Sequence, residues 1–136
     1  MKIKLTIAFA LMGMISLVAC GQEQKKESKT VEEVKEIVYL NIGPAEFKKE
    51  MQTEATDYLL VDVRTADEFN AGAIEGAMNY DFLNGDFQAQ SEKWDPSQPI
   101  YLYCAKGGRS SKAAEILKNK GFERIVELKG GYSSWE

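Results

Sequence analysis

The chain has 136 residues, of which 44% are hydrophobic and 28% are charged, a composition typical of one globular domain without a fibrous or disordered bias. Its 17 basic residues are outnumbered by 21 acidic ones, which excludes the basic footprint of a nucleic-acid-binding protein, so we expect no nucleic-acid partner. There is no histidine and there are two cysteines, which excludes imidazole catalysis, a histidine-ligated metal and a zinc site of four thiolates.

The N-terminus has the organisation of a secretion signal. Lys2 and Lys4 precede an apolar run at residues 5–19, which is shorter than a membrane span of about 20 residues and suits a signal peptide. The run ends in Leu-Val-Ala-Cys-Gly, with Cys20 as its cysteine, and resembles the lipobox of bacterial lipoproteins. The resemblance implies cleavage before Cys20, lipidation of Cys20 and an extracytoplasmic protein held on a bacterial membrane by lipid, on the periplasmic side or at the cell surface. An ordinary signal peptide or an uncleaved anchor is the alternative.

The residues that follow Cys20 are expected to form a charged tether. The stretch from Gln22 to Glu36 is rich in Lys, Glu and Gln and has no aromatic residue, so it cannot bury a core. Apolar residues near its end fall close to helical spacing, which allows a partly helical tether. We therefore predict a signal peptide at 1–19, a lipidated cysteine and tether at 20–37, and one domain at 38–136.

The first half of this domain alternates strand and helix patterns. Pro44 suits the first turn of a helix. The apolar run at residues 58–63 is typical of a strand buried on both faces of a parallel sheet. Thr65 and Glu68 form a capping box that opens a short helix. The predicted elements are strands at 37–40, 58–63 and 77–79, and helices at 44–51, 65–70 and 82–91.

The second half continues this alternation. A strand at residues 99–103 ends at Cys104, and a glycine-containing loop at 105–109 leads into an amphipathic helix at 110–120 that Gly121 stops. A last strand at 124–128 and a final helical turn after Gly130–Gly131 complete the domain. This order predicts an α/β fold with a mainly parallel central sheet and helices on both faces.

The segment from Cys104 to Arg109 carries the strongest chemical signal. It joins a buried strand to the start of a helix, at the sheet edge where α/β proteins bind ligands. Gly107 and Gly108 permit tight curvature and positive φ values, so that backbone N–H groups can point inward, and the helix N-terminus adds positive charge. In this field we expect Cys104 to be a largely ionised nucleophile that acts on an anionic substrate. The predicted substrate-binding residues are Ala105, Lys106, Gly107, Gly108 and Arg109.

The loop length separates two classes of cysteine enzyme. Cysteine phosphatases place five residues between the cysteine and the arginine, and rhodaneses have a loop that is one residue shorter. Here four residues separate Cys104 from Arg109, which favours sulfur transfer. A phosphatase also commonly uses a separate acid for its leaving group, and no such acid is identifiable.

Three segments together resemble the rhodanese homology domain across about residues 38–136. Ala73 stands where this family often has a histidine, which is usually structural. The similar segments are Leu60–Arg64 with Glu68, Phe69, Gly72, Ile74, Gly76 and Ala77 for the first signature, Cys104–Ser110 for the active-site loop, and Gly130–Trp135 for the closing signature.

This resemblance implies a sulfurtransferase that works by a ping-pong reaction. Cys104 would take a sulfane sulfur from thiosulfate or another small anionic donor, hold it as a persulfide, and pass it to cyanide, a thiol or a protein. Asp62 and Arg64 would support the loop by hydrogen bonds or an ion pair, and no metal or organic cofactor is expected. The alternatives are a sulfur-carrier or binding module that serves one protein partner and, disfavoured by the short loop, a cysteine phosphatase or arsenate-handling enzyme.

Overall fold

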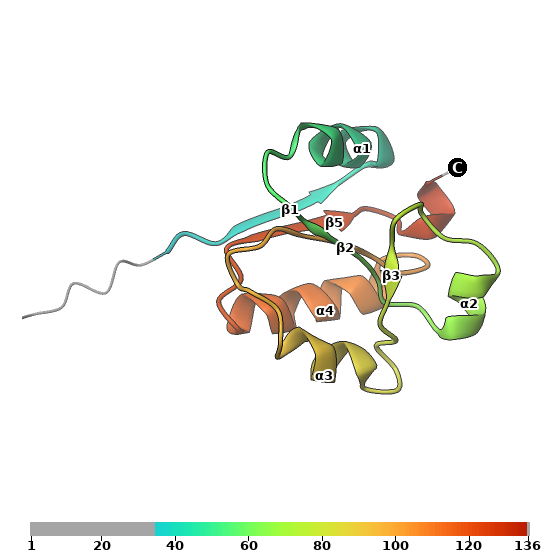
Figure 1. The fold of residues 1–136 in the computed structure, drawn as a ribbon. Coiled ribbons are helices and arrows are strands. Elements are labelled where there is room, and N and C mark those ends of the chain that lie inside the picture. The colour runs from blue at the N-terminus through green and yellow to red at the C-terminus, as the bar shows by residue number, and fades with distance from the viewer. Residues whose placement is uncertain (1–34, 136) are drawn as a thin grey trace, which may run out of the picture. The chain divides into compact units, whose positions relative to one another are not determined.

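The computed structural model describes residues 35–135, and these contain one five-stranded sheet in which every neighbouring pair of strands is parallel (Figure 1). The strand order is β1-β5-β4-β2-β3, so β4 has a strand on either side and lies in the middle of the sheet. All four residues of β4 are buried, as expected for a strand covered on both faces. The strands are β1 (Val38–Ile42), β2 (Leu59–Asp62), β3 (Met78–Asn79), β4 (Ile100–Tyr103) and β5 (Arg124–Leu128).

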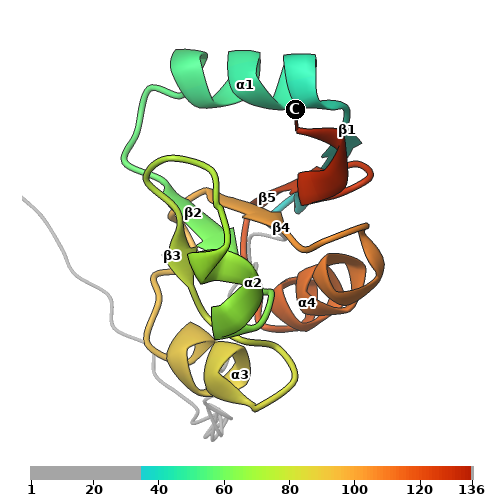
Figure 2. The same cartoon turned by 90° about the vertical axis from the view of Figure 1, so that its right-hand side faces the viewer.

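Helices cover both faces of this sheet. Figures 1 and 2 show α1 (Pro44–Thr53) on one face, and α3 (Asp86–Ser91) and α4 (Gly108–Asn119) on the other. The short helix α2 (Ala66–Asn70) follows the carboxyl end of β2, and a 3-10 turn (Tyr132–Ser134) follows β5. The prediction of an α/β fold with a parallel sheet between helices is confirmed.

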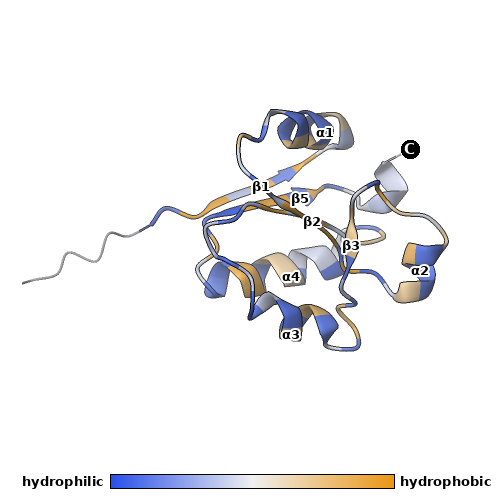
Figure 3. Cartoon of the chain, in the orientation of Figure 1, coloured by the Kyte–Doolittle hydropathy of each residue, from blue (hydrophilic) through white to orange (hydrophobic). Residues whose placement is uncertain are grey.

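Each face of the sheet has its own apolar core, and Figure 3 shows hydrophobic residues concentrated along the strands. Side chains alternate between the faces along β4. Ile100 and Leu102 pack with Phe87 of α3 and Leu117 of α4, whereas Tyr101 packs with residues of the α1 face. Cys104, two residues beyond Leu102, belongs to the α3 and α4 core, so its side chain faces α4.

All the predicted elements are present, and two helices begin two or more residues away from the predicted start. α3 begins at Asp86 instead of residue 82, because Gly85 has a φ of 88°, which cannot lie inside a right-handed helix. α4 begins at Gly108 instead of Ser110, so the loop is shorter than predicted. The capping box of Thr65 and Glu68 is confirmed.

Residues 1–34 lie outside the described part of the chain. The predicted signal peptide at 1–19, the lipidation of Cys20 and nearly all of the predicted tether fall there, and the domain boundary at residue 38 stays a prediction. Within residues 35–135, no helix has the length and apolar character needed to cross a membrane.

Candidate active site

Cys104 lies at the carboxyl edge of the sheet, directly after the central strand β4. The chain then turns through residues 105–107 and enters α4 at Gly108. This is the edge at which open α/β sheets bind ligands, because loops and helix N-termini converge there. Cys104 is only 1% exposed, so its sulfur depends on protein groups for hydrogen bonds.

The loop directs hydrogen-bond donors at this sulfur. The backbone N–H of Gly107 lies 3.0 Å from Cys104 Sγ, and Ser110 Oγ lies 3.4 Å from it. Gly107 has a φ of 106°, which a glycine adopts without strain, whereas Gly108 already belongs to the helix. Burial acts to raise the pKa of the Cys104 thiol, but the Ser110 hydroxyl and the surrounding backbone N–H groups outweigh burial, and the pKa lies below its ordinary value. These contacts favour the thiolate, which is the nucleophilic form.

Cys104 is reached through a pocket of about 380 Å³. Its wall carries three cationic side chains, Lys106, Arg109 and Lys112, and an apolar side made by Phe82 and Leu83. Opposite charges attract an anionic ligand to such a site, and the apolar side limits its contact with water. The complete lining is Phe82, Leu83, Cys104, Ala105, Lys106, Gly108, Arg109 and Lys112.

Arg109 is held by a carboxylate from another helix. Its Nη1 and Nη2 atoms each lie 2.7 Å from an oxygen of Glu68, which also caps α2. These hydrogen bonds lower the pKa of Glu68 to about 2, so Glu68 is ionised at neutral pH. The bidentate pair therefore joins α2 to α4 beside the pocket, and Arg109 shares its charge with Glu68 instead of offering all of it to a substrate.

Asp62 and Arg64 form a buried ion pair below the loop. Arg64 Nη2 lies 2.6 Å from Asp62 Oδ2 and 2.6 Å from the carbonyl oxygen of Gly72. The guanidinium also lies 4.2 Å from the centre of the Tyr132 ring and 5.5 Å from that of Tyr103. Asp62 and Arg64 therefore pair with each other, and Arg64 also bonds to Gly72. Their contacts toward the Cys104 loop are with the Tyr103 and Tyr132 rings, so direct support of residues 105–109 stays a prediction.

The 3-10 turn after β5 clamps the other side of the loop. The backbone N–H of Tyr132 donates to the carbonyl oxygen of Cys104 at 2.7 Å, and that of Ser133 donates to the carbonyl oxygen of Ala105 at 3.1 Å. Gly131 makes this approach possible: a Cβ there would lie 2.5 Å from Cys104 O and 2.6 Å from the carbonyl carbon of Ala105. Gly131 therefore serves the loop by its lack of a side chain, whereas a Cβ at Gly130 would meet only Ser134.

The structure brings all the predicted loop residues to one site and adds others. Lys112 follows Arg109 by three residues on α4, so helical spacing could have placed it on the same side. Glu68 was recognised only as a capping residue, because its partner Arg109 lies 41 residues away in the chain. Phe82 and Leu83 come from a turn that ends in Asn84–Gly85, a local turn signal that the predicted helix over 82–91 does not take into account.

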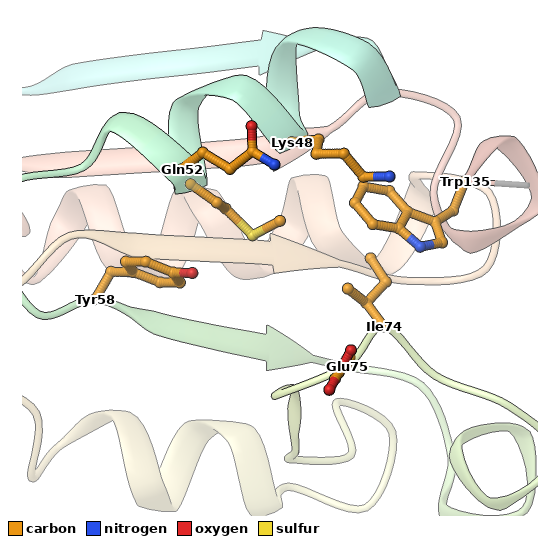
Figure 4. A pocket seen from close by; sticks show the side chains of 7 residues that line it. Lys48, Gln52, Tyr58, Ile74, Glu75 and Trp135 are labelled. Atoms are coloured by element: carbon orange, nitrogen blue, oxygen red, sulfur yellow. The ribbon is translucent and has the colours of Figure 1, made fainter.

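A second hollow, of about 500 Å³, opens on the α1 face and does not include Cys104 (Figure 4). Lys48 Nζ lies 5.2 Å from the centre of the Trp135 ring at the border of this hollow. The hollow is lined by Lys48, Met51, Gln52, Tyr58, Ile74, Glu75 and Trp135.

Across residues 35–135, no three carboxylate or cysteine groups are placed to hold a metal ion.

The sequence model of the rhodanese-like domain matches residues 43–136. The chain belongs to the rhodanese-like domain family. Thiosulfate sulfurtransferase GlpE of Shewanella oneidensis is 37% identical to this rhodanese-like chain over 84 residues, which are 61% of this chain and 80% of that protein. The uncharacterised protein YqhL of Bacillus subtilis is also 37% identical, over 76 residues that are 56% of this chain and 59% of that protein.

Solved structures of rhodanese-like proteins share this fold. The rhodanese-like domain protein of Staphylococcus aureus is 28% identical, with a TM-score of 0.62 over 71% of this chain and 91% of that chain. The rhodanese-related protein of Thermoplasma volcanium is 27% identical, with a TM-score of 0.60 over 71% and 90%. The predicted family is confirmed.

Replacing Gly131 with alanine is expected to displace the rhodanese-like loop. The new Cβ would meet backbone atoms of Cys104 and Ala105, and the φ of 64° is strained for alanine. We expect the pH midpoint of Cys104 alkylation by iodoacetamide to rise by about one unit, so that the alkylation rate falls about tenfold at a pH below both midpoints. The control is Gly121→Ala, which has a φ of 81° but open space around its Cβ. Equal rates in the two variants would contradict the clamp.

The ion pair of Glu68 and Arg109 predicts a pH dependence of stability. The pKa of Glu68 is about 2 in the folded chain, against an ordinary value of 4.5. Because the folded-state pKa is lowered, the pair contributes fully above about pH 4.5, and its contribution is lost as the pH falls toward 2. Urea unfolding should show the free-energy difference between wild type and Glu68→Gln shrinking across this window. A Glu75→Gln control, at an exposed position, should show no such change, and a constant Glu68 difference would contradict the prediction.

Proposed function

We propose that this domain transfers a sulfane sulfur from a small anionic donor such as thiosulfate to a thiophilic acceptor, with Cys104 as the carrier. The observation that carries this proposal is a buried sulfur 3.0 Å from the Gly107 N–H, at the base of a pocket with three cationic side chains. The similarity to a thiosulfate sulfurtransferase supports the same chemistry.

The reaction has two steps. The Cys104 thiolate attacks the outer sulfur of thiosulfate, the S–S bond of the donor breaks, and sulfite leaves with its electron pair, so that Cys104 becomes a persulfide anion. Cyanide or a thiolate then attacks the terminal sulfur, the S–S bond to Cys104 breaks, and the thiolate is restored. Atoms and electrons balance in both steps without an external oxidant or reductant.

The pocket suits this donor class by charge. Lys106 is exposed at the mouth, and Lys112 stands on the next turn of α4, so both favour entry of a small dianion. The backbone N–H groups around Sγ would also receive the negative charge of the persulfide. Arg109, Asp62 and Arg64 act by holding the loop and its neighbours in place.

One observation favours the second candidate, a sulfur carrier that serves a protein partner. Leu83 forms part of the pocket wall and is 66% exposed. An exposed apolar residue beside a reactive sulfur offers a contact for the surface of a protein acceptor. In this case turnover with small acceptors would be slow while the persulfide forms normally.

We further propose that the mature protein is lipidated on Cys20 and held outside the cytoplasm at a bacterial membrane. The basic residues, the apolar run and the lipobox-like segment that ends at Cys20 support this. Lipid would then keep the domain near the membrane surface, with the charged segment after Cys20 as the link.

Cys104→Ser is expected to abolish thiocyanate formation from thiosulfate and cyanide, because a serine hydroxyl at neutral pH is not an effective sulfur nucleophile. Intact mass spectrometry after incubation with thiosulfate should show one added sulfur atom on wild type and none on Cys104→Ser. The control is Ser97→Ala, an exposed serine outside the site, which should keep both thiocyanate formation and the added sulfur. Unchanged turnover in Cys104→Ser would overturn the proposal.

The same assays separate the candidates. Rapid thiocyanate formation favours the enzyme, and a persulfide that forms but turns over slowly favours the carrier. Hydrolysis of an aryl phosphate at a comparable rate would instead favour a cysteine phosphatase.

Lipid attachment is tested with the full chain in a bacterial host. After growth with a fatty-acid analogue that carries a chemical handle, the wild-type protein should be labelled and should be found in the membrane fraction. The Cys20→Ser protein should be unlabelled. An unlabelled wild-type protein would contradict lipidation at Cys20.

A further inference from the structure

A buried carboxylate lies beside the cradle of Cys104, on the neighbouring strand. Glu127 of β5 is 0% exposed, and its side chain faces the first turn of α4. Ser110 Oγ donates to Glu127 Oε1 at 2.6 Å, and Ser111 Oγ donates to the same oxygen at 2.9 Å. On the other oxygen, the hydroxyl of Tyr39 donates to Oε2, and Asn41 Nδ2 donates to it at 3.4 Å. Four neutral donors therefore surround this carboxylate.

Glu127 has no cationic partner among the ion pairs of residues 35–135. On β1, burial and the contact with Glu127 raise the pKa of Tyr39 to about 12, so Tyr39 remains a donor. On α4, Lys118 Nζ lies 3.6 Å from the centre of the Tyr39 ring and pairs with Glu115, and the charges of Arg109 and Lys112 line the Cys104 pocket. A buried carboxylate without a cation relies on its hydrogen bonds.

Ser110 connects Glu127 to the nucleophile. Its Oγ lies 2.6 Å from Glu127 Oε1 and 3.4 Å from Cys104 Sγ, and it also lies 3.1 Å from the carbonyl oxygen of Gly107. A serine hydroxyl has one hydrogen, so it can donate to the carboxylate or to the sulfur, but not fully to both. The shorter distance favours the carboxylate while Cys104 is a thiol.

We propose that Glu127 is a positioning residue for the nucleophile: it competes with Cys104 for the single Ser110 hydrogen and thereby sets how readily Cys104 ionises. While Cys104 is protonated, Ser110 donates to Glu127. When the thiol loses its proton to solvent, the Ser110 hydrogen turns to the sulfur, and Glu127 keeps Tyr39 and Asn41 as donors. Ser111 can also donate to Glu127, but its Oγ lies 2.8 Å from the carbonyl oxygen of Gly107, which competes for its one hydrogen.

The direction of the effect follows from charge and from hydrogen bonding. Negative charge on the Glu127 side chain would oppose a second negative charge on Sγ, and the hold of Glu127 on Ser110 removes a donor from the thiolate. Glutamine at residue 127 removes the charge and holds Ser110 less strongly, so both effects lower the pKa of Cys104. Alanine at residue 110 removes the donor itself and raises this pKa. A general loss of packing would not lower the pKa of Cys104 in Glu127→Gln and raise it in Ser110→Ala, because these two residues are in contact.

The test is the pH dependence of Cys104 alkylation by iodoacetamide in wild type, Glu127→Gln, Ser110→Ala and the double variant. We expect the midpoint to fall by about one pH unit in Glu127→Gln, about tenfold more thiolate at a pH below both midpoints, and to rise in Ser110→Ala. In the Ser110→Ala background the Glu127→Gln shift should shrink by more than half, because the two residues act through one hydrogen. Glu115→Gln, an exposed charge removal on the same helix, should leave the midpoint unchanged.

A midpoint that is unchanged or raised in Glu127→Gln overturns the proposal, and so does an undiminished shift in the double variant, since that indicates a through-space field without Ser110. Should Glu127→Gln fail to fold in a thermal unfolding scan, Tyr39→Phe keeps the buried carboxylate but removes one of its other donors. Glu127 then depends more on Ser110, and the midpoint should rise; a fall or no change contradicts the proposal.

The positioning role of Glu127 concerns the same sulfur as the proposed function. It rests on that function only in that sulfur transfer would use the Cys104 thiolate. Alkylation reports the ionisation of Cys104 without any sulfur donor or acceptor. A failure of sulfur transfer therefore leaves the alkylation result interpretable, and the two outcomes are distinguishable.

Discussion

An ionised sulfur with almost no contact with water must receive its hydrogen bonds from the protein, and the architecture around Cys104 meets that requirement. The central strand delivers the sulfur to the sheet edge, and the positive φ of Gly107 turns a backbone N–H back toward it. The 3-10 turn holds the carbonyl oxygens of the loop on the opposite side, which keeps the N–H groups facing inward. Without that curvature the same residues would make an ordinary strand-to-helix connection.

Charges near the site are arranged as pairs between different elements. Arg109 of α4 meets Glu68 of α2, and Arg64 after β2 meets Asp62 and two aromatic rings. Each pair fixes a backbone segment by a bidentate or multiple contact, which is more specific in geometry than a lysine contact. Lys106 and Lys112, by contrast, are exposed and line the Cys104 pocket. The cations at this edge of the sheet therefore divide into arginines held in ion pairs and exposed lysines.

Much of the fold follows from local patterns in the sequence. The buried run of β4 and the capping box of α2 each have a short-range physical cause, and the α/β alternation follows from the order of such patterns. Gly131 is required by a long-range contact instead, because a Cβ there would meet Cys104 and Ala105. The site was harder to anticipate. The partners Glu68 and Arg109, and Glu127 and Ser110, are joined by the parallel sheet order and not by spacing in the chain. The sequence pattern assigns Gly108 and Arg109 to the loop, because no capping side chain marks the start of α4. The N-cap of α4 is Gly107, whose φ lies in the left-handed region.

The depth of Cys104 Sγ creates an asymmetry between its two chemical states. A second sulfur bonded to Sγ would extend about 2 Å farther along the pocket. That added atom would occupy part of the pocket that Phe82 and Leu83 also line. A loaded side chain would therefore leave less room in the pocket than the free thiol does, and a bulky reagent would meet a different space in each state.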